Sequence, residues 1–390
     1  MNNTAVITTL SNVRDHPNAD RLKLATVFGT QVIVGLESKD GDVVIYFDSN
    51  LRLSHEYLHH NNLYSSPELN EDTTVKGYFG KNGRVRAQKL RGEVSNGYVA
   101  PLESVYFACK RSIDLKPGDE FTSMQGTEIC SKYIIPGSIR YGSIKYWSSK
   151  ISAYPTFWKH WDTRQLMREK NKIPTEQVLY VEEKIHGTSA RTAKIPTEKK
   201  WWQFWKPDYI VISGTRRLDH IGNHMPIERE EIEEKVAPHL RKGEQIYYEI
   251  FGYMRSGGEV QKGFSYGCEP GRYRVVLYRV TITTPDGFCV DLPREQVYQR
   301  ASELGLEAPT LLRRAPIVLR LISNLEDFWS GILNLANGKS TLDAGTIREG
   351  IVVWYQDKGQ WKCLKHKSEE YLMFESKQKD EEIGDVEDAL

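Results

Sequence analysis

The residues best suited to covalent chemistry lie in segment 181–189, which reads VEEKIHGTS. Lys184 stands three residues before Gly187, after two acidic residues and before a Thr-Ser pair. Residues 177–181 are apolar and β-prone, so we expect Lys184 at the end of a strand and a close turn at Gly187. A lysine amine placed in this way can attack an electrophile. The alternative interpretation of the isolated segment is a solvated lysine in an ordinary turn.

Polar residues recur within or beside apolar, β-prone runs later in the chain. They are Arg216 with its neighbour Arg217 after 209–215, Glu249 within 245–252, Tyr278 within 274–280, Glu349 before 350–354, and Lys365 and Lys367 within 361–367. In a strand, Lys365 and Lys367 point to the same face, where both can reach one phosphate. The carboxylate of Glu249 lies in an apolar run and needs a ribose or a basic neighbour as its partner. Each run can also be an ordinary strand with a solvated charge.

The segment EKIHGTS resembles motif I of the covalent nucleotidyltransferases, the superfamily of ATP-dependent ligases and mRNA capping enzymes. It is most similar to the RNA ligase form of the motif, in which histidine takes the third position. The later runs resemble, in family order, motifs Ia (YIVISGTRR), III (QIYYEIFG), IIIa (RVVLYRV), IV (IREGIVVW) and V (WKCLKHK). Two residues depart from the family pattern: Arg279 stands where many relatives carry an acid, and Ser189 replaces an asparagine of some relatives.

The resemblance implies a role for each predicted site residue. Lys184 is implied to be the nucleophile, with Lys365 and Lys367 as further catalytic residues. The residues implied to contact the nucleotide are Glu183, Gly187, Arg216 (ribose), Glu249 (ribose hydroxyl) and Tyr278 (purine stacking). Glu349 is implied to bind a divalent metal ion, Mg²⁺ or Mn²⁺. The implied cofactors are therefore ATP, which supplies a covalent AMP, and this metal ion.

The implied reaction needs an unprotonated lysine amine, although a free lysine has a pKa of about 10.4. Neighbouring cations such as Lys365, Lys367 and a bound metal disfavour the ammonium form and are expected to lower the pKa of Lys184. The same cations stabilise charge that develops on the α-phosphate. The family resemblance implies three steps: Lys184 takes AMP from ATP, AMP passes to an RNA 5′-phosphate, and a 3′-hydroxyl displaces AMP.

The composition is that of a folded protein without a uniformly basic surface. The chain has 390 residues, 39% of them hydrophobic, and its 53 basic and 52 acidic side chains nearly cancel. Any surface for nucleic acid must therefore be local. The five scattered cysteines lack zinc spacing and are expected to be free thiols. No apolar run reaches the roughly 20 residues of a membrane span, and the N-terminus is unlike a secretory signal, so we expect a cytoplasmic protein without membrane contact.

Residues 1–125 are predicted to form a small β-barrel, because short β-prone runs alternate with turns. These runs are 5–10, 22–27, 31–34 and 43–47. The segment that begins HPNADRLKLATV resembles the OB-fold of tRNA-binding domains. Contact with RNA and an ordinary barrel without such a role are both open interpretations. The basic run 83–92 fits a face that tracks phosphates, or charges that protect a strand edge.

Three further stretches allow more than one interpretation. The histidines His55, His59 and His60 suggest a metal site, but their spacing favours a solvated helix or loop. The segment 199–206, KKWWQFWK, is either a base-stacking or partner-binding tip or an insertion packed on the core. Residues 376–390 are acidic and nearly free of aromatics, so we expect a frayed tail.

The sequence thus predicts an α+β protein, with an N-terminal OB-fold barrel followed by a nucleotidyltransferase (ATP-grasp-like ligase) domain of antiparallel sheets flanked by helices. The expected divisions are an RNA-binding-type domain at 1–125, a connector at 126–155, an adenylyltransferase domain at 156–375 and a tail at 376–390. Motif V lies near the end of the chain, so we expect no carboxy-terminal OB domain of the kind found in DNA ligases and capping enzymes.

This arrangement resembles the RNA ligases of the Deinococcus and Naegleria type. It implies an ATP-dependent RNA ligase that seals 3′-OH/5′-phosphate breaks or nicks, acts on RNA, in particular nicked duplex, and is a monomer. One alternative is a capping-type guanylyltransferase, which GTP labelling would favour. The other is a non-catalytic RNA-binding protein with a tRNA-binding-type OB module, which would bind RNA without any nucleotide chemistry.

Overall fold

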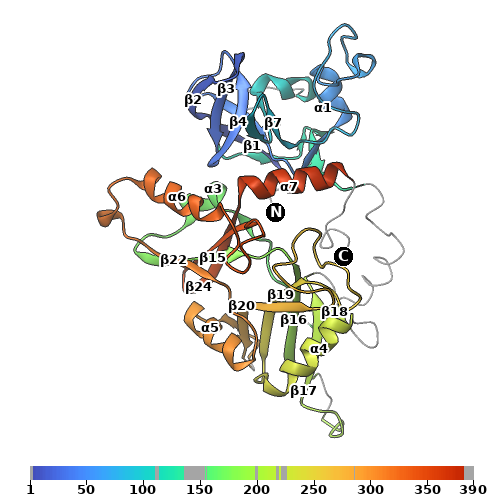
Figure 1. The fold of residues 1–390 in the computed structure, drawn as a ribbon, viewed down its shortest axis with the longest axis vertical. Coiled ribbons are helices and arrows are strands. Elements are labelled where there is room, and N and C mark those ends of the chain that lie inside the picture. Colours follow the sequence, from blue (N-terminus) through green and yellow to red (C-terminus); the bar gives the residue numbers. More distant parts are fainter. Residues whose placement is uncertain are drawn as a thin grey trace. The chain divides into compact units, whose positions relative to one another are not determined.

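The computed structural model describes residues 3–109, 114–135, 154, 156–197, 201–216, 219–220, 226–284 and 286–381 (Figure 1). These residues form two compact units. One unit combines Met1–Ile135 with Glu369–Ile383, and the other spans Pro136–Ser368. Mixed helices and mostly antiparallel sheets confirm the predicted α+β class. Within the described residues, no helix is long and apolar enough to cross a membrane.

The first unit is built from short antiparallel strands. One sheet has the order β10-β1-β5-β9 and a second the order β2-β3-β4, with bounds β1 (Ala5–Thr9), β2 (Ser11–His16), β3 (Ala19–Val27), β4 (Thr30–Gly35), β5 (Val43–Phe47), β9 (Tyr98–Pro101) and β10 (Glu120–Phe121). The runs predicted at 22–27 and 31–34 lie in β3 and β4, which pair with each other antiparallel. Smaller pairs are β6 (Leu51–Leu53) with β13 (Cys130–Lys132), β7 (Ala87–Leu90) with β8 (Glu93–Asn96), and β11 (Ser123–Met124) with β12 (Thr127–Glu128). The pairings of the described strands do not close a barrel, so the OB-fold stays a prediction.

Helix α7 (Glu369–Asp380) belongs to this first unit although it follows the last strand of the second. Arg84, only 1% exposed, donates to Asp380 Oδ1 at 2.7 Å and to the carbonyl oxygen of Ser376 at 2.8 Å. Arg86 donates to the same Asp380 oxygen at 2.9 Å. The phosphate-tracking interpretation is therefore wrong for Arg84, whose buried guanidinium is paired with α7, and it stays open for the part-exposed Arg86.

Two predicted boundaries also differ from the structure. The first part of the expected tail is not frayed, because residues 376–380 continue helix α7. The side chains of Ser376 and Lys379 in this helix are buried. Residues 126–135 belong to the first unit, where β12 and β13 pair with its other strands, rather than to a connector. The remainder of the expected connector, 136–153 and 155, and the end of the expected tail, 382–390, lie outside the described residues.

The second unit contains two sheets. The five-stranded sheet has the order β14-β24-β23-β15-β22, formed by β14 (Arg164–Gln165), β15 (Gln177–Lys184), β22 (Leu311–Ile317), β23 (Gly350–Asp357) and β24 (Gln360–Lys367). The six-stranded sheet has the order β18-β17-β16-β19-β20-β21, formed by β16 (Thr188–Pro196), β17 (Tyr209–Thr215), β18 (Asp219–His220), β19 (Glu244–Gly252), β20 (Tyr273–Thr283) and β21 (Cys289–Asp291). The α-helices among the described residues of this unit are α3 (Leu166–Glu169), α4 (Ile227–Val236), α5 (Arg294–Glu303) and α6 (Leu325–Leu333).

Alternation along the strands gives each sheet one core face. In β15, Leu179 and Val181 pack with Ile351 of β23 and with Trp329 and Ile332 of α6. In the six-stranded sheet, apolar residues of β16, β19 and β20 pack against both α4 and α5, which cover the same face. Because side chains alternate between faces, the opposite faces carry smaller apolar clusters around Ala193 and Trp354 together with the polar residues of the site.

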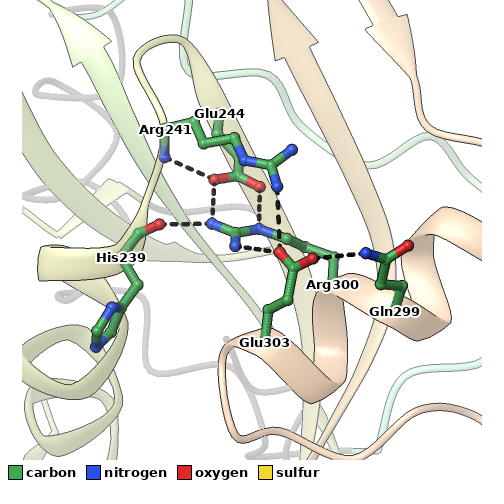
Figure 2. A network of polar contacts seen from close by, with 6 residues as sticks. All are labelled: His239, Arg241, Glu244, Gln299, Arg300 and Glu303. Carbon is green, nitrogen blue, oxygen red and sulfur yellow. Dashed lines mark hydrogen bonds and ion pairs between the residues drawn. The ribbon is translucent and has the colours of Figure 1, made fainter.

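A buried ionic network holds α5 to the six-stranded sheet (Figure 2). Arg300 of α5 donates to both carboxylate oxygens of Glu244, at 2.7 and 2.8 Å. The same guanidinium donates to Glu303 at 2.7 Å and to the carbonyl oxygen of His239 at 2.5 Å. The backbone N–H of Arg241 donates to Glu244 at 2.7 Å. Buried charges need partners of this kind, and this network supplies them within one sheet and its helices.

Candidate active site

The three predicted catalytic lysines lie on one face of the five-stranded sheet. Lys184 of β15 is opposite Gly350 of β23, and Gly350 is opposite Lys367 of β24. The next row in register joins Glu182 of β15 to Lys365 of β24 across β23. Residues directly opposite each other, and residues two apart in one strand, point to the same face. The strand register therefore gathers Lys184, Lys365 and Lys367.

Gly350 keeps the row between Lys184 and Lys367 clear of a side chain. A Cβ atom on Gly350 would lie 2.1 Å from the carbonyl oxygen of His366 and 2.8 Å from the Cα atom of Lys367. Any other residue would have to push β23 away from β24. The glycine is thus required by the close approach of the two strands.

Glu349, which directly precedes β23, forms an ion pair with Lys184. Its Oε2 atom lies 2.8 Å from Lys184 Nζ and 3.8 Å from His186 Nδ1. The Glu349 side chain is 2% exposed, whereas that of Lys184 is 24% exposed. The buried carboxylate has the positive partner that it needs, and the lysine can be reached from solvent. The predicted metal ligand and the predicted nucleophile are therefore in direct contact.

Lys365 is a buried cation with other cations beside it. Burial, together with the charges of Lys367 and Lys184, lowers the pKa of Lys365 to about 8. Glu349 acts in the opposite direction and Arg216 adds to the lowering. At pH 7 the ammonium form still predominates, so the positive charges of this face lie close together in a poorly solvated place. Such a place favours an incoming anion.

The turn after β15 is held by residues outside the predicted motifs. His186 donates its backbone N–H to the Tyr266 hydroxyl at 2.8 Å, and Gln261 donates to the carbonyl oxygen of Gly187 at 2.8 Å. A Cβ atom on Gly187 would lie 2.3 Å from the carbonyl oxygen of Ile250 in β19. Gly187 therefore allows a close approach to the neighbouring strand.

The six-stranded sheet contributes Glu249 and Tyr278. Ser189 of β16 is opposite Glu249 of β19, so both side chains point to one face. At Tyr278 the register between β19 and β20 shifts by one residue, which is a β-bulge. The Tyr278 hydroxyl lies 2.7 Å from Ser189 Oγ, and its ring packs against the cluster that contains Trp354 of the five-stranded sheet. The structure thus places Tyr278 between the two sheets.

Arg216 follows β17, as predicted for motif Ia. Its Nη2 atom lies 2.5 Å from Asp162 Oδ1, and its side chain is 20% exposed. Its charge contributes to the lowered pKa of Lys365, which places it near the lysines. The competing residue, Arg217, lies outside the described residues.

Glu183 is the predicted nucleotide contact that the structure places elsewhere. It points to the opposite face of β15 from Lys184, and its Oε2 atom accepts hydrogen bonds from the backbone N–H and the hydroxyl of Thr341 at 2.8 and 2.6 Å. Arg348 Nε lies 3.7 Å from the same oxygen. These contacts tie the end of β15 to the segment that leads into Glu349, and they set Glu183 apart from the three lysines.

The residues around Glu349 fit a metal ion that arrives with a nucleotide. Among the residues that the structure describes, no three His, Cys, Asp or Glu side chains are arranged to hold a metal. Mg²⁺ commonly takes only one or two carboxylates and completes its coordination with substrate phosphates and water. Glu349, a buried carboxylate beside a cluster of lysines, suits that arrangement. His55, His59 and His60 all lie in the short helix α1 (His55–His60) and are not part of any such group among the described residues.

The aromatic run between β16 and β17 is exposed, which contradicts the packed-insertion interpretation. The exposed fractions are 90% for Trp201, 44% for Trp202, 84% for Phe204 and 66% for Trp205. The other interpretation, a tip that binds a base or a partner, stays a prediction.

The comparisons with known proteins identify the fold. No family model and no curated protein sequence matches the chain. A solved structure of Naegleria gruberi RNA ligase with PPi is 19% identical, with a TM-score of 0.61 over 97% of this chain and 100% of that chain. A mutant of the same ligase with ATP and Mn is 19% identical, with a TM-score of 0.61 over 94% of this chain and 98% of that chain. The chain therefore has the fold of this RNA ligase.

Proposed function

We propose that the chain is an ATP-dependent RNA ligase that seals 3′-OH/5′-phosphate breaks or nicks through a lysyl-AMP intermediate and an adenylylated RNA 5′ end. The observation that carries the proposal is the gathering of Lys184, Lys365 and Lys367 on one sheet face, with Glu349 paired to the first of them. The similarity in fold supports it, because structures of the Naegleria gruberi RNA ligase are described with PPi, with ATP and Mn, and with AMP and Mn.

In the first step, the amine of Lys184 attacks the α-phosphorus of ATP. The Lys184 ammonium first gives one proton to solvent, and the free amine attacks. A nitrogen–phosphorus bond forms, the bond from the α-phosphorus to the bridging oxygen breaks, pyrophosphate leaves, and the nitrogen gives a second proton to solvent. The ion pair with Glu349, at 2.8 Å, holds the first proton on the amine and must separate before attack. Lys365 and Lys367 supply positive charge for the phosphate oxygens as the transition state develops.

Glu349 is the residue that would hold the divalent metal ion, with nucleotide phosphates as further ligands. When bound, the metal supplies positive charge that orients the phosphates and stabilises the pyrophosphate leaving group. Glu349 can hold either the metal or the lysine ammonium, so loading of the site would favour release of the Lys184 side chain.

Nucleotide recognition is proposed for the residues of the six-stranded sheet. Tyr278 would stack on the purine, Glu249 would accept from a ribose hydroxyl, and Arg216 would contact the ribose. Gly187 would support them indirectly, through its close approach to β19. Glu183 keeps a supporting role at the end of β15, through its hydrogen bonds to Thr341.

The two later steps transfer AMP from Lys184 to the RNA and then release it. A 5′-phosphate oxygen of the RNA attacks the lysyl-AMP phosphorus, which breaks the nitrogen–phosphorus bond and restores the Lys184 amine. The 3′-hydroxyl oxygen then attacks the RNA 5′-phosphorus and gives its proton to solvent; the new phosphodiester forms as the phosphoanhydride bond to AMP breaks, and AMP leaves. Both steps place negative phosphates beside the same lysines, so one cluster serves the whole sequence.

The test is sealing of a nicked RNA duplex with ATP and either Mg²⁺ or Mn²⁺. Sealed product is expected from the unchanged protein and none from Lys184→Ala. The matched control is Lys362→Ala, because Lys362 is also in β24 but pairs with Asp357 at 2.5 Å and is 46% exposed. Duplexes with DNA on either side of the nick measure strand tolerance.

Two results would contradict the proposal. Labelling by GTP in place of ATP would indicate a capping-type guanylyltransferase. Binding of RNA without covalent labelling by either nucleotide, in protein shown to be free of bound AMP, would indicate a non-catalytic RNA-binding protein.

A further inference from the structure

One buried arginine connects the two sheets at the site. Arg294, the first residue of α5, is 1% exposed. Its Nε and Nη2 atoms donate to Glu182 Oε1 at 2.9 and 2.5 Å, and its Nη1 atom donates to the carbonyl oxygen of Tyr278 at 2.7 Å. The Tyr298 hydroxyl donates to the same Glu182 oxygen at 2.5 Å.

Both partners of Arg294 are next to proposed catalytic or nucleotide-binding groups. Glu182 is two residues before Lys184 on the same face of β15, and it shares a cross-strand row with Lys365. The Tyr278 carbonyl belongs to the β-bulge in β20. The ring of the same tyrosine is proposed to stack on the purine. One guanidinium thus links the phosphate side of the site to the base side.

We infer that Arg294 is a positioning residue for nucleotide transfer, which fixes the Tyr278 bulge against β15 and withholds the Glu182 carboxylate from the lysines. The inference rests on the proposed function. No motif of the nucleotide site contains this residue, and it reaches the site only through Glu182 and Tyr278.

The geometry explains why an arginine is needed. Its donors are fixed in one plane, so a single side chain holds a carboxylate and a carbonyl in set directions. The guanidinium also lies over the Trp354 ring, 4.3 Å from its centroid, which fixes the plane itself. A lysine in this place could neutralise Glu182 but could not hold both partners in the same plane.

The second effect concerns charge. Glu182 is 1% exposed, so without Arg294 its carboxylate is left buried beside cations of its own sheet face. A buried charge without a partner is costly, so a conformation that brings another cation to the carboxylate is favoured. The cation in its row is Lys365, and an ion pair there would remove positive charge that the nucleotide phosphates need.

Helix α5 provides a matched control in Arg300 (Figure 2). Arg300 is also buried and also pairs with a buried glutamate, Glu244, through two hydrogen bonds. Its partners, however, are confined to the six-stranded sheet and its helices. Substitution of Arg300 therefore removes a similar ionic pair from the same helix without touching Glu182 or Tyr278.

The first experiment compares Arg294→Met with Arg300→Met in the full-length protein. Both are measured by the single-turnover rate of labelling with α-labelled ATP, by the ATP concentration for half-maximal rate, and by the melting temperature. Arg294→Met is expected to slow labelling by about 10- to 100-fold and to raise the required ATP concentration. Both variants are expected to lower the melting temperature, and by similar amounts. Arg300→Met is expected to keep its labelling rate within about threefold of that of the unchanged protein.

Two double variants separate positioning from general stability. In a Tyr278→Ala background, Arg294→Met is expected to slow labelling by a smaller factor than in the otherwise unchanged protein, because the ring that Arg294 positions is already missing and only the effect of the unpaired Glu182 carboxylate remains. The Arg300→Met effect should be the same in both backgrounds. Addition of Glu182→Gln to Arg294→Met removes the unpaired carboxylate and is expected to restore part of the rate. This double variant also keeps the test available if Arg294→Met alone does not fold.

The inference is overturned if Arg294→Met labels within about threefold of Arg300→Met at equal melting temperature, or if its effect is unchanged by Tyr278→Ala. It is also overturned if the foldable double variant labels as fast as Glu182→Gln alone with an unchanged ATP requirement. Failure of the proposed function gives a different result, since the unchanged protein would then show no label.

Discussion

The two arginines of helix α5 are alike in chemistry and differ in what they connect. Arg300 binds Glu244 within the six-stranded sheet, and both charges are enclosed in a network whose partners lie on neighbouring helices and turns (Figure 2). Arg294 binds Glu182 of the other sheet and the backbone of Tyr278. The first pair closes one sheet against its helices, whereas the second joins two sheets at the place where a nucleotide would lie.

The comparison separates stability from function in a single helix. A buried pair of either kind is costly to break, so burial and ion pairing alone do not mark a functional residue. The two arginines differ in the surroundings of the glutamate that each one binds. Glu244 lies in a closed network, while Glu182 lies on the face that carries Lys184, Lys365 and Lys367.

The largest expected effects on stability come from breaking either pair. Arg300→Met leaves Glu244 buried without its main partner, and Arg294→Met does the same to Glu182. Each substitution should lower the free energy of unfolding by about 3 to 5 kcal/mol, measured by urea denaturation. The double variant Arg300→Met with Glu244→Met is the control, and it should recover most of the loss because no buried charge remains. A loss below about 1 kcal/mol for the single variants would show that these are not stabilising buried pairs.

Gly187→Ala should have the next largest effect, because the new Cβ atom would lie 2.3 Å from the carbonyl oxygen of Ile250. The backbone must shift at the proposed active site, with an expected loss of about 1 to 3 kcal/mol and slower labelling by ATP. Gly35→Ala is the matched control, since a Cβ atom there would meet nothing within 4 Å. Equal stability and labelling rates in the two variants would contradict the close packing of the turn.

Lys365 should give a pH effect that neither arginine network gives. Burial and the neighbouring lysines lower its pKa to about 8, so between pH 8 and about 10.4 the unfolded chain holds this proton more tightly than the folded protein. The penalty for the charged lysine is complete below pH 8 and is relieved as pH rises. The free energy of unfolding should gain up to about 1.4 kcal/mol per pH unit in this window.

The measurement is denaturation of the unchanged protein, Lys365→Met and Lys362→Met across that pH range. The contribution should disappear only in Lys365→Met, because Lys362 is 46% exposed and lies outside the cluster. An identical pH dependence in all three proteins would contradict the buried cation.

The smallest effect is expected at the exposed aromatic run. Trp201 is 90% exposed and Phe204 is 84% exposed, so Trp201→Gln and Phe204→Gln should each change the free energy of unfolding by less than about 0.5 kcal/mol. A loss of several kcal/mol in either variant would restore the packed-insertion interpretation.

Local patterns were enough to predict the strands that carry the site. Lys184 ends β15, Glu349 precedes β23, and Lys365 and Lys367 share one face of β24, as alternation predicts. Period-two alternation within one strand needs no knowledge of the partner strand. It also explains the misplaced residue, because Glu183 must point away from Lys184 once β15 extends through both.

The remaining features depend on contacts between distant parts of the chain. The pair of Arg294 with Glu182 spans 112 residues, and that of Arg84 with Asp380 spans 296 residues. No local pattern marks either partner, so the sequence alone predicts a frayed tail from residue 376 onward, where the structure has the end of α7, and it does not single out Arg294. The bulge at Tyr278 depends on the register between β19 and β20, which one strand's sequence does not specify.

The most direct test of the central claim is covalent labelling with α-labelled ATP and, separately, GTP in the presence of a divalent metal, followed by denaturing electrophoresis and mapping of the labelled peptide. We predict an acid-labile AMP label on Lys184 from ATP, which is lost in Lys184→Ala and kept in Lys362→Ala. No label from either nucleotide, in protein shown to be free of bound AMP, or a label that persists in Lys184→Ala, would contradict the account.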